Sequence, residues 1–446
     1  MKTPDQRDRH ELWRYIMPSI IGMTVAGSFS IVDTIFIGRA TGETGLAAVA
    51  VTWPLLMLVM AVGSLCGGGG AVLVSQARGA NDEQSAQTAF RMTWGLSLFF
   101  SIALTLSLLP YLPPMLQAMG ADAQLMPQSL AYARIMLSGL ILSVFMGMFI
   151  EIIRNDGSPK LAMWMVVLGL LVNALLDWYF IMQLGWGVSG AAWASIIGEA
   201  VSALVGIYYF YSRHTTLRFP LRLQKTDWLR TGEILRTGLP IFGGSIAIIA
   251  MLYLHNFQSL RYGQVDGLAA YTMVAAVESL GSLLLTGLAG GMQPLTARMY
   301  GAKEYSRQNA IGNYSYTLAF GMGILLMLFS FATCTLMPAW MGLSGHAADL
   351  AERGLVLSAP AFLLLGVIRV AAYYYQSTGK TLDSSLLIYG DSFVVLPLCL
   401  FTLPLLWDMD GVWLSMPASR VLLFGLLLYL WYGKKKPGKA GLKNEA

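Results

Sequence analysis

The chain has 446 residues, of which 56% are apolar and only 12% are charged, whereas about 25% of the residues in an ordinary soluble domain are charged. A soluble globule of this composition would leave many apolar side chains in water, which excludes the soluble classes. A transmembrane helix takes about 20 apolar residues, so this chain, with its modest net charge of +5, has room for on the order of twelve spans.

Twelve apolar runs, each bounded by charged, glycine or proline residues, predict twelve transmembrane helices and an all-α integral membrane protein. The first ten residues are polar and charged, so a removable signal peptide is not expected. In chain order the helices are expected near residues 12–37, 46–77, 88–112, 128–152, 160–182, 188–211, 234–260, 267–298, 309–337, 350–376, 384–407 and 412–432.

Basic residues are distributed unevenly between the two sides of the predicted membrane. If both ends of the chain lie inside, 23 of the 29 Lys and Arg residues fall on the cytoplasmic side and two lie within spans. Cytoplasmic loops hold an excess of Lys and Arg, so both termini are expected to be cytoplasmic. This orientation accounts for the net charge, and no nucleic-acid partner is expected. The basic residues expected outside are Arg39, Arg134, Arg261 and Arg353.

The two halves of the chain match each other when the sequence is shifted on itself by a constant offset of 222. The run Gly45-Leu46-Ala47-Ala48 recurs as Gly267-Leu268-Ala269-Ala270. A further shift of two positions brings Gly187 opposite Gly411. Other pairs in the first register are Pro18 with Pro240, Gly22 with Gly244, Gly68 with Gly290, Gly79 with Gly301 and Gly157 with Gly379.

Matches that hold one register over some 140 residues predict two six-helix lobes. Because six is an even number, both lobes enter the membrane from the same side and form parallel repeats, with a substrate cavity expected at their interface. The predicted division is an N-terminal lobe at 1–211, a basic cytoplasmic linker at 212–232, a C-terminal lobe at 233–433 and a basic cytoplasmic tail at 434–446.

Neither a cofactor nor an enzymatic site is expected. The three cysteines, Cys66, Cys334 and Cys399, lie in apolar runs without a Cys or His partner at ligand spacing. The glycine run at residues 67–70 lacks the Gly-Lys-Ser/Thr of a phosphate loop. No catalytic pair lies at one bilayer depth, so the energy for any transport must come from an ion gradient or from the gradient of the substrate.

Acidic residues inside spans require an explanation, because a charge near the middle of a bilayer costs roughly 2.5–3.5 kcal/mol on insertion scales. Such residues are typical of ion or substrate pathways. Five acids meet this criterion, and three of them belong to the N-terminal lobe. They are Asp33, Asp177, Glu199, Glu278 and Asp391.

The three acids of the N-terminal lobe have polar neighbours at helical spacing. Asn173 and Asp177 are four residues apart on one helix face, and Ser195 and Glu199 repeat this spacing on the next helix. Together with Asp33 they predict an oxygen-rich pocket in which two carboxylates cannot both ionise cheaply. We expect this pocket to bind the coupling proton. Two alternatives are a Na⁺ ion held at Asp33, Asn173 and Asp177, and a polar cluster with a structural role only.

In the C-terminal lobe the repeat places His255 opposite Asp33. A histidine near a span end is more often an interfacial residue than a proton relay, and the first of these interpretations is favoured. His255, Glu278, Arg369 and Tyr373 are the candidates for lining the substrate cavity, where an acid would attract cations and aromatic rings would stack on them. An interfacial aromatic belt is an equally good interpretation of Tyr373.

Several motifs recur together in one known family. Pro18 lies fifteen residues before Asp33, and the fifth span contains Asn173-x-x-x-Asp177. The loop Arg-Asn-Asp-Gly-Ser-Pro at 154–159 and the run Gly-Val-Ser-Gly-Ala-Ala-Trp-Ala-Ser at 187–195 complete the set. This combination resembles the multidrug and toxic compound extrusion (MATE) transporters over nearly the whole chain, and it is more similar to the DinF-like and MepA-like bacterial branch than to the NorM-like one.

The resemblance implies a MATE fold, in which a pseudo-two-fold axis relates the two six-helix lobes, in a bacterial inner membrane. It also implies a cation site at Asp33, Asn173, Asp177 and Ser195, with Ser in place of the family's Thr. The NorM-like cation site uses acids in spans 7 and 10, where this chain has His255 and Arg369, which argues against Na⁺ in the C-terminal lobe.

The function implied by the resemblance is a secondary active multidrug efflux antiporter that exports amphipathic, cationic small molecules in exchange for H⁺ or Na⁺ by rocking of the lobes. The alternative is a lipid or lipid-linked sugar flippase of the same superfamily, although Arg369 and Arg420 are the only basic residues inside the spans. The expected partners are small-molecule xenobiotics or metabolites and membrane lipids. A monomer is expected.

Overall fold

A computed structural model describes residues 4–219 and 231–433, apart from the side chains of residues 29–31. Most of the expected linker at 212–232 and all of the expected tail at 434–446 lie outside these residues. All regular structure in the described part is helical. The elements are α1 (Gln6–Gly79), α2 (Glu83–Leu108), η1 (Leu109–Tyr111), α3 (Leu112–Ala118), α4 (Met126–Ser138), α5 (Leu140–Asn155), α6 (Pro159–Asp177), η2 (Trp178–Gln183), α7 (Gly187–Tyr211), α8 (Thr231–Gly301), α9 (Tyr305–Thr333), α10 (Leu336–Trp340), α11 (Gly345–Ser358), α12 (Ala361–Ser377), α13 (Thr381–Gly390), η4 (Asp391–Val395), α14 (Leu396–Thr402) and α15 (Pro404–Gly433).

The described helices account for twelve membrane crossings, as predicted. Helices α1 and α8 have 74 and 71 residues and would each be more than about 100 Å long if straight, over three times the bilayer core. Each is broken once, at Gly42 and Gln264, and therefore contains two spans. Six other long apolar helices each cross once, and the bent pairs α4–α5 and α11–α12 provide the last two crossings.

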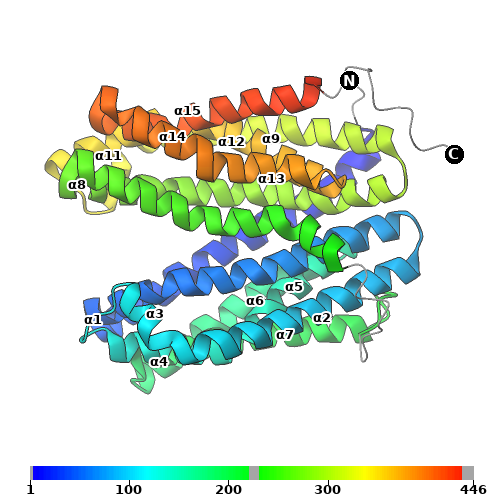
Figure 1. Cartoon of the computed structure of the whole chain (residues 1–446), viewed down its shortest axis with the longest axis horizontal. Coiled ribbons are helices and arrows are strands. Elements are labelled where there is room, and N and C mark those ends of the chain that lie inside the picture. The colour runs from blue at the N-terminus through cyan, green and yellow to red at the C-terminus, as the bar shows by residue number, and fades with distance from the viewer. Residues whose placement is uncertain (1–3, 220–230, 434–446) are drawn as a thin grey trace.

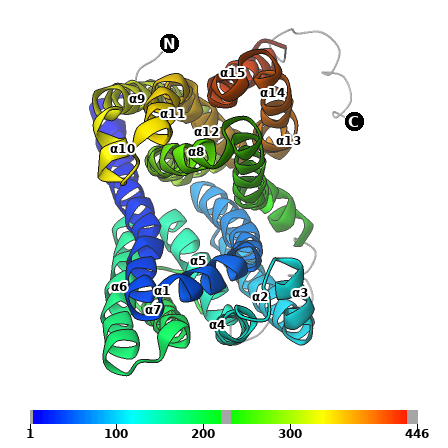
Figure 2. The same cartoon turned by 90° about the vertical axis from the view of Figure 1, so that its left-hand side faces the viewer.

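The helices form two lobes that meet at one end of the molecule. Figures 1 and 2 show most of α1 and all of α2–α7 in the first lobe and α8–α15 in the second, with the beginning of α1 packed against the second lobe. In Figure 1 the ribbons of the lobes lie close together at one end and apart at the other. We call the closed end, which carries the turns at 80–82, 156–158, 302–304 and 378–380, the basic end, and the opposite end the far end.

The internal repeat is visible in the backbone conformation. Gly42 and Gln264, which break the two longest helices, have φ values of 64° and 53° and correspond to each other at the offset of 222. Three other pairs of turn residues with positive φ are related by the same offset. They are Asn81 with Lys303, Gly120 with Gly342, and Gly157 with Gly379. The turns of the second lobe therefore repeat those of the first in the register that the sequence predicts.

We expect Gln264→Gly to stabilise the protein by about 0.5–1 kcal/mol, because it relieves a left-handed strain of roughly 1–2 kcal/mol, and the greater conformational freedom of glycine offsets about 0.5–1 kcal/mol of that gain. Gln264 is exposed, so little packing is lost. A higher melting temperature of purified protein in detergent would agree with this. Gln264→Ala keeps the strain and is the matched control; equal melting temperatures for the two variants would contradict the prediction.

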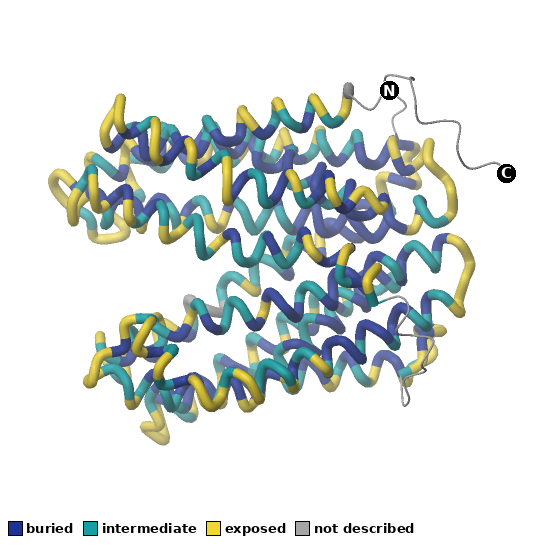
Figure 3. The backbone as a smooth tube through the Cα atoms, viewed as in Figure 1, coloured by how far each residue is buried: buried dark blue, intermediate teal, exposed yellow. Residues whose placement is uncertain are grey.

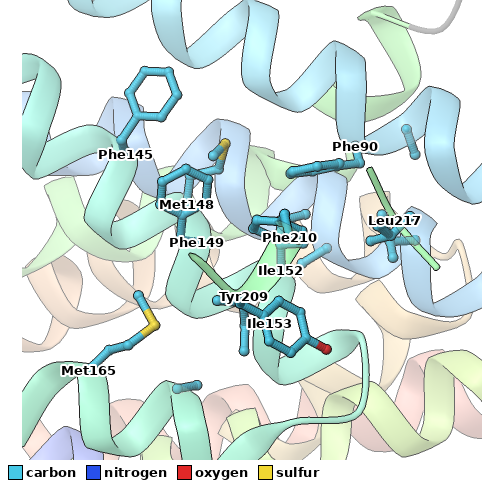
Figure 4. Packing of buried hydrophobic residues seen from close by; sticks show 14 of the residues in the cluster. Phe90, Phe145, Met148, Phe149, Ile152, Ile153, Met165, Tyr209, Phe210 and Leu217 are labelled. Carbon is cyan, nitrogen blue, oxygen red and sulfur yellow. The ribbon is translucent and has the colours of Figure 1, made fainter. Parts of the chain in front are cut away.

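The interior of the first lobe is aromatic near the basic end. Phe90 of α2 stacks on Phe210 of α7 with ring centroids 4.3 Å apart, and Phe149 of α5 packs against the same ring (Figure 4). Elsewhere, large apolar side chains such as Trp164 and Leu175 are more than half exposed. Figure 3 shows buried and exposed residues alternating along the helices of both lobes, as expected for helices that face lipid on one side.

The turn at 155–159, part of the family motif, is anchored by a buried carboxylate. Asp156 forms an ion pair with Arg78 at 2.5 Å and accepts a hydrogen bond of 2.8 Å from the Tyr209 hydroxyl. Burial raises the pKa of Asp156, and the hydroxyl of Thr215 and the charge of Arg78 oppose this effect. The motif therefore connects the turn to α1 and α7 at the basic end.

At the basic end the lobes are held together by a pair of contacts that the internal repeat relates to each other. A Cβ atom at Gly79 would overlap the carbonyl oxygen of Arg298, and one at Gly301 would overlap the carbonyl oxygen of Gln76. The repeat offset relates the two glycines and also the two residues that face them, so the contacts are symmetry mates. Around them, Ser75 donates a hydrogen bond of 2.7 Å to the Pro294 carbonyl, Gln76 donates one of 2.8 Å to the Ser377 carbonyl, and Arg307 pairs with Asp8 at 2.6 Å.

Candidate functional site

The structure brings four of the predicted site residues together inside the first lobe. Asp33 of α1 lies beside Asn173 and Asp177 of α6 and Ser195 of α7. Asp33 is 9% exposed, and the other three are almost completely buried. The Asn173 amide donates a hydrogen bond of 3.4 Å to the Ser195 hydroxyl. The predicted pocket therefore exists as a cluster of side chains, and its role in coupling stays a prediction.

Local sequence explains how α6 and α7 approach each other here. A Cβ at Gly198 would lie 2.7 Å from the carbonyl oxygen of Gly169 and 3.2 Å from the Cβ of Asn173, so a glycine at this position permits close packing. Asp177 is the last residue of α6, and the π-helical segment η2 follows it directly. Such π-helical turns are frequent at functional sites because they change which side chains face inward.

Four oxygen atoms of the cluster lack a hydrogen-bond donor. Asp33 Oδ1, Asn173 Oδ1 and both carboxylate oxygens of Asp177 are buried without a hydrogen-bond partner in the described structure. Two facing carboxylates in a buried site cannot both carry an uncompensated charge. The geometry can therefore hold a proton between the two acids, or a small cation among carboxylate and neutral oxygens. No cluster of three or more His, Cys, Asp or Glu suited to a metal ion occurs in the described residues.

Glu199 lies one helical turn beyond Ser195 and accepts a hydrogen bond from Ser143 of α5. It is within electrostatic range of Asp33. The phenol of Tyr132 on α4 is buried in the same region and lies within range of Asp33, Asp177 and Glu199. Sequence reasoning missed Tyr132 and Ser143, because a tyrosine and a serine in apolar helices are common and carry no spacing signal.

His255 differs from the interfacial residue that the sequence favours. It is 0% exposed, and its ring is stacked on Tyr271 with a centroid distance of 5.1 Å. Its Nδ1 lies 2.8 Å from the Met251 carbonyl oxygen, and its Nε2 has no hydrogen-bond partner in the described structure. The interfacial interpretation is wrong for the physical reason that Tyr271 and the surrounding helices of the second lobe cover the ring. His255 therefore does not line an open surface in this conformation.

The other three candidates for the substrate cavity do not form one group. Glu278 and Arg369 are half-buried within the second lobe and lie in the electrostatic field of Arg420. Tyr373, one turn beyond Arg369 on α12, lies at the lobe interface in range of Glu151 and Arg154 of the first lobe. The structure thus places Tyr373 between the lobes and the two charged residues deeper in the second lobe.

Two further ion pairs, neither of them predicted, have both partners less than a quarter exposed. Arg420 of α15 pairs with Asp391, the first residue of the π-helical segment η4, and Arg154 pairs with Glu151 on α5. The signal for the first pair was present in the sequence, because consecutive spans carried opposite intramembrane charges. The sequence alone could not determine that the two helices face each other at this depth.

Together the fold and the site define a multi-pass membrane protein made of two repeated six-helix lobes with a buried carboxylate cluster in one of them. The MatE family model matches residues 18–179 and again residues 240–401, so the two matches are related by the offset of the internal repeat. The chain therefore belongs to the MatE family, as the sequence motifs indicated.

Individual relatives are distant but match nearly the whole chain. The multidrug export protein MepA of Staphylococcus aureus is 22% identical over 426 residues, which is 94% of this chain and 93% of that protein. MepA of Staphylococcus haemolyticus is 22% identical over 428 residues, covering 94% and 92%.

Solved structures show the same fold. An outward-facing multidrug resistance MATE family transporter of the MOP superfamily superposes with a TM-score of 0.89 at 23% identity over 96% of each chain. A MOP superfamily transporter from Pyrococcus furiosus, described as having a binding pocket of reversed polarity, gives 0.88 at 23% identity, also over 96% of each chain. These structures have the twelve-helix MATE architecture, so the predicted fold is confirmed.

Proposed function

We propose that this protein is a secondary active multidrug antiporter that exports amphipathic, cationic small molecules in exchange for protons. The two MepA proteins and the outward-facing transporter named above are described as multidrug export or multidrug resistance proteins, which supports the export of small molecules. The observation that carries the choice of a cation-coupled mechanism is the carboxylate cluster of Asp33 and Asp177, in which Asp33 Oδ1 and both carboxylate oxygens of Asp177 are buried without a hydrogen-bond partner in the described structure. We assign the coupling ion to this cluster.

The charge balance of the first lobe supports this assignment. Asp33, Asp177 and Glu199 are three acids at membrane depth, and none of them forms an ion pair among the described residues. Uncompensated charges in a bilayer are costly, so protons or another cation must neutralise at least part of this charge. A proton suits the cluster best, because two facing carboxyl groups can share one without further ligands.

Helix α1 connects the cluster to the lobe interface. Its first span packs Ile16 and Ile20 against Gly291 and Gly287 of the second lobe, where added Cβ atoms would lie 2.6 and 2.7 Å from the two isoleucine Cα atoms. Thirteen residues beyond Ile20 the same span contributes Asp33 to the first lobe. Protonation of Asp33 removes its charge and its hydrogen-bond acceptance, so we propose that it changes the path of this span and loosens the closed basic end.

We further propose that the protein lies in the bacterial cytoplasmic membrane as a monomer with the basic end, and both termini, in the cytoplasm. The bias of Lys and Arg toward this end supports that orientation. In this orientation the structure is closed toward the cytoplasm. It is then the conformation that releases substrate to the outside and admits protons.

The proposal is tested by transport of a fluorescent lipophilic cation into everted membrane vesicles. We expect transport when a proton gradient alone is imposed, and loss of transport when a protonophore dissipates it. Vesicles from cells with an empty vector are the control. Transport that survives the protonophore but requires a Na⁺ gradient would replace the proton by Na⁺ at the same cluster. Transport that needs neither gradient would reject cation antiport.

A further inference from the structure

The repeat identifies the residues of the second lobe that occupy the places of the carboxylate cluster. At the offset of 222, Asp33 corresponds to His255 and Asp177 corresponds to Cys399. In the last span, where the offset is 224, Ser195 corresponds to Ser419. His255 and Ser419 are 0% exposed and Cys399 is 5% exposed, so the corresponding place in the second lobe is also buried. It contains no carboxylate at the two matched positions.

A guanidinium group lies near this place. Arg420 directly follows Ser419, is 5% exposed and forms an ion pair with Asp391, which is 7% exposed. Arg420 lies within electrostatic range of both His255 and Cys399, the counterparts of the two acids. The charged head of Arg420 therefore lies near the residues that correspond to the unpaired carboxyl groups of the first lobe.

The charged residues around Arg420 are balanced. The groups that face it are Asp391 from η4, Glu278 from α8 and Arg369 from α12, with His255 and Cys399 as further titratable neighbours. Two acids and two arginines give this network no formal excess of charge. The first lobe, in contrast, has three acids at membrane depth and no ion-paired partner for any of them among the described residues.

We propose that Arg420 is a built-in cation that permanently fills the second lobe's counterpart of the cation site, so that ion coupling passes through the first lobe alone. An arginine side chain cannot be deprotonated in proteins, so it neutralises Asp391 in every state of the transport cycle. An exchangeable proton is then not needed at Asp391. This inference rests on the proposed function, because it presumes that Asp33 exchanges protons with substrate.

The experiment measures proton release when tetraphenylphosphonium is added to purified protein in weakly buffered detergent solution. We expect release by the wild type, no release by Asp33→Asn, and release restored in Asp33→Asn/Arg420→Gln, where Asp391 has lost its partner and must bind a proton. Asp33→Asn/Arg420→Lys keeps a positive charge beside Asp391 and is expected to release no proton. The triple variant Asp33→Asn/Arg420→Gln/Asp391→Asn lacks both charges of the pair and is also expected to release no proton.

The results distinguish this inference from the proposed function. A folded Asp33→Asn/Arg420→Gln variant that binds tetraphenylphosphonium without releasing a proton would overturn the role of Arg420. So would release that persists in Asp33→Asn and disappears on adding Asp391→Asn. If the Arg420→Gln variants do not elute as a single species, the single variant Asp391→Asn decides: wild-type release supports the inference and reduced release rejects it. Absence of release by the wild type itself would instead reject the proposed function.

Discussion

Asp33→Asn and Asp177→Asn are each expected to reduce proton-driven export to the level of vesicles that lack the protein. The two carboxyl groups lie side by side and buried, and three of their four oxygens have no hydrogen-bond partner in the described structure, so an amide at either position removes the group that gains and loses the proton. The substitution keeps the size of the side chain and should preserve the fold. Uptake of a fluorescent lipophilic cation into everted vesicles under an imposed proton gradient measures the effect.

The matched control for these variants is Asp349→Asn, which changes an exposed acid on α11 at the far end of the second lobe. It alters net charge by the same amount and should leave export unchanged. Equal amounts of each protein in the membrane must be verified by immunoblotting. Full gradient-driven export by both cluster variants would remove the cluster from the coupling mechanism.

Gly301→Ala is expected to prevent closure of the basic end and to abolish export. An added methyl group would overlap the carbonyl oxygen of Gln76 across the lobe interface, although the same change in an isolated helix would be stabilising by up to about 1 kcal/mol. Overpacking a tight contact costs roughly 1–3 kcal/mol, which shifts the balance between closed and open basic ends by about 5- to 150-fold. A loss of closure would therefore indicate that packing between the lobes dominates, whereas a gain in stability would indicate that helix propensity dominates.

A native cysteine reports on this closure. Cys66 is 0% exposed and packs in a cluster with Ile234 of the second lobe, so separation of the lobes should make it reactive toward maleimide. We expect faster labelling of Cys66 in Gly301→Ala, located by mass spectrometry of peptides. The control is Gly321→Ala on α9, where nothing lies within 4 Å of the added Cβ. Equal labelling rates in the two variants would mean that the Gly301 contact does not hold the lobes closed.

The membrane spans were the part of the fold that the sequence could predict, because apolar runs and their breaks are local properties of the chain. Apolar runs located the break between 260 and 267, but the positive φ of Gln264 could be predicted only through the repeat, since a glutamine in that conformation has no sequence signal of its own. Its partner Gly42 carries the expected residue for that conformation. Comparison of the two halves therefore gave information that neither half contained alone.

The site was partly predictable for the same reason. Asn173 and Asp177, like Ser195 and Glu199, could be placed on common faces because four-residue spacing on a helix determines direction. Assignments that depended on the neighbours of a residue were less reliable. Burial of His255 depends on Tyr271, which lies on the other span of α8 and stacks on its ring. Pairing of Asp391 with Arg420 likewise depends on how η4 and α15 pack together.

The symmetric glycine contacts at the basic end have a consequence for the origin of the protein. Gly79 and Gly301 each meet a main-chain carbonyl oxygen, of Arg298 and Gln76, so the contact does not depend on the side chain that faces it. The surface is therefore self-complementary, and a polypeptide made of one half could associate with a second copy of itself through it. A contact of this kind lets the charged interiors of the two halves differ while their assembly stays the same.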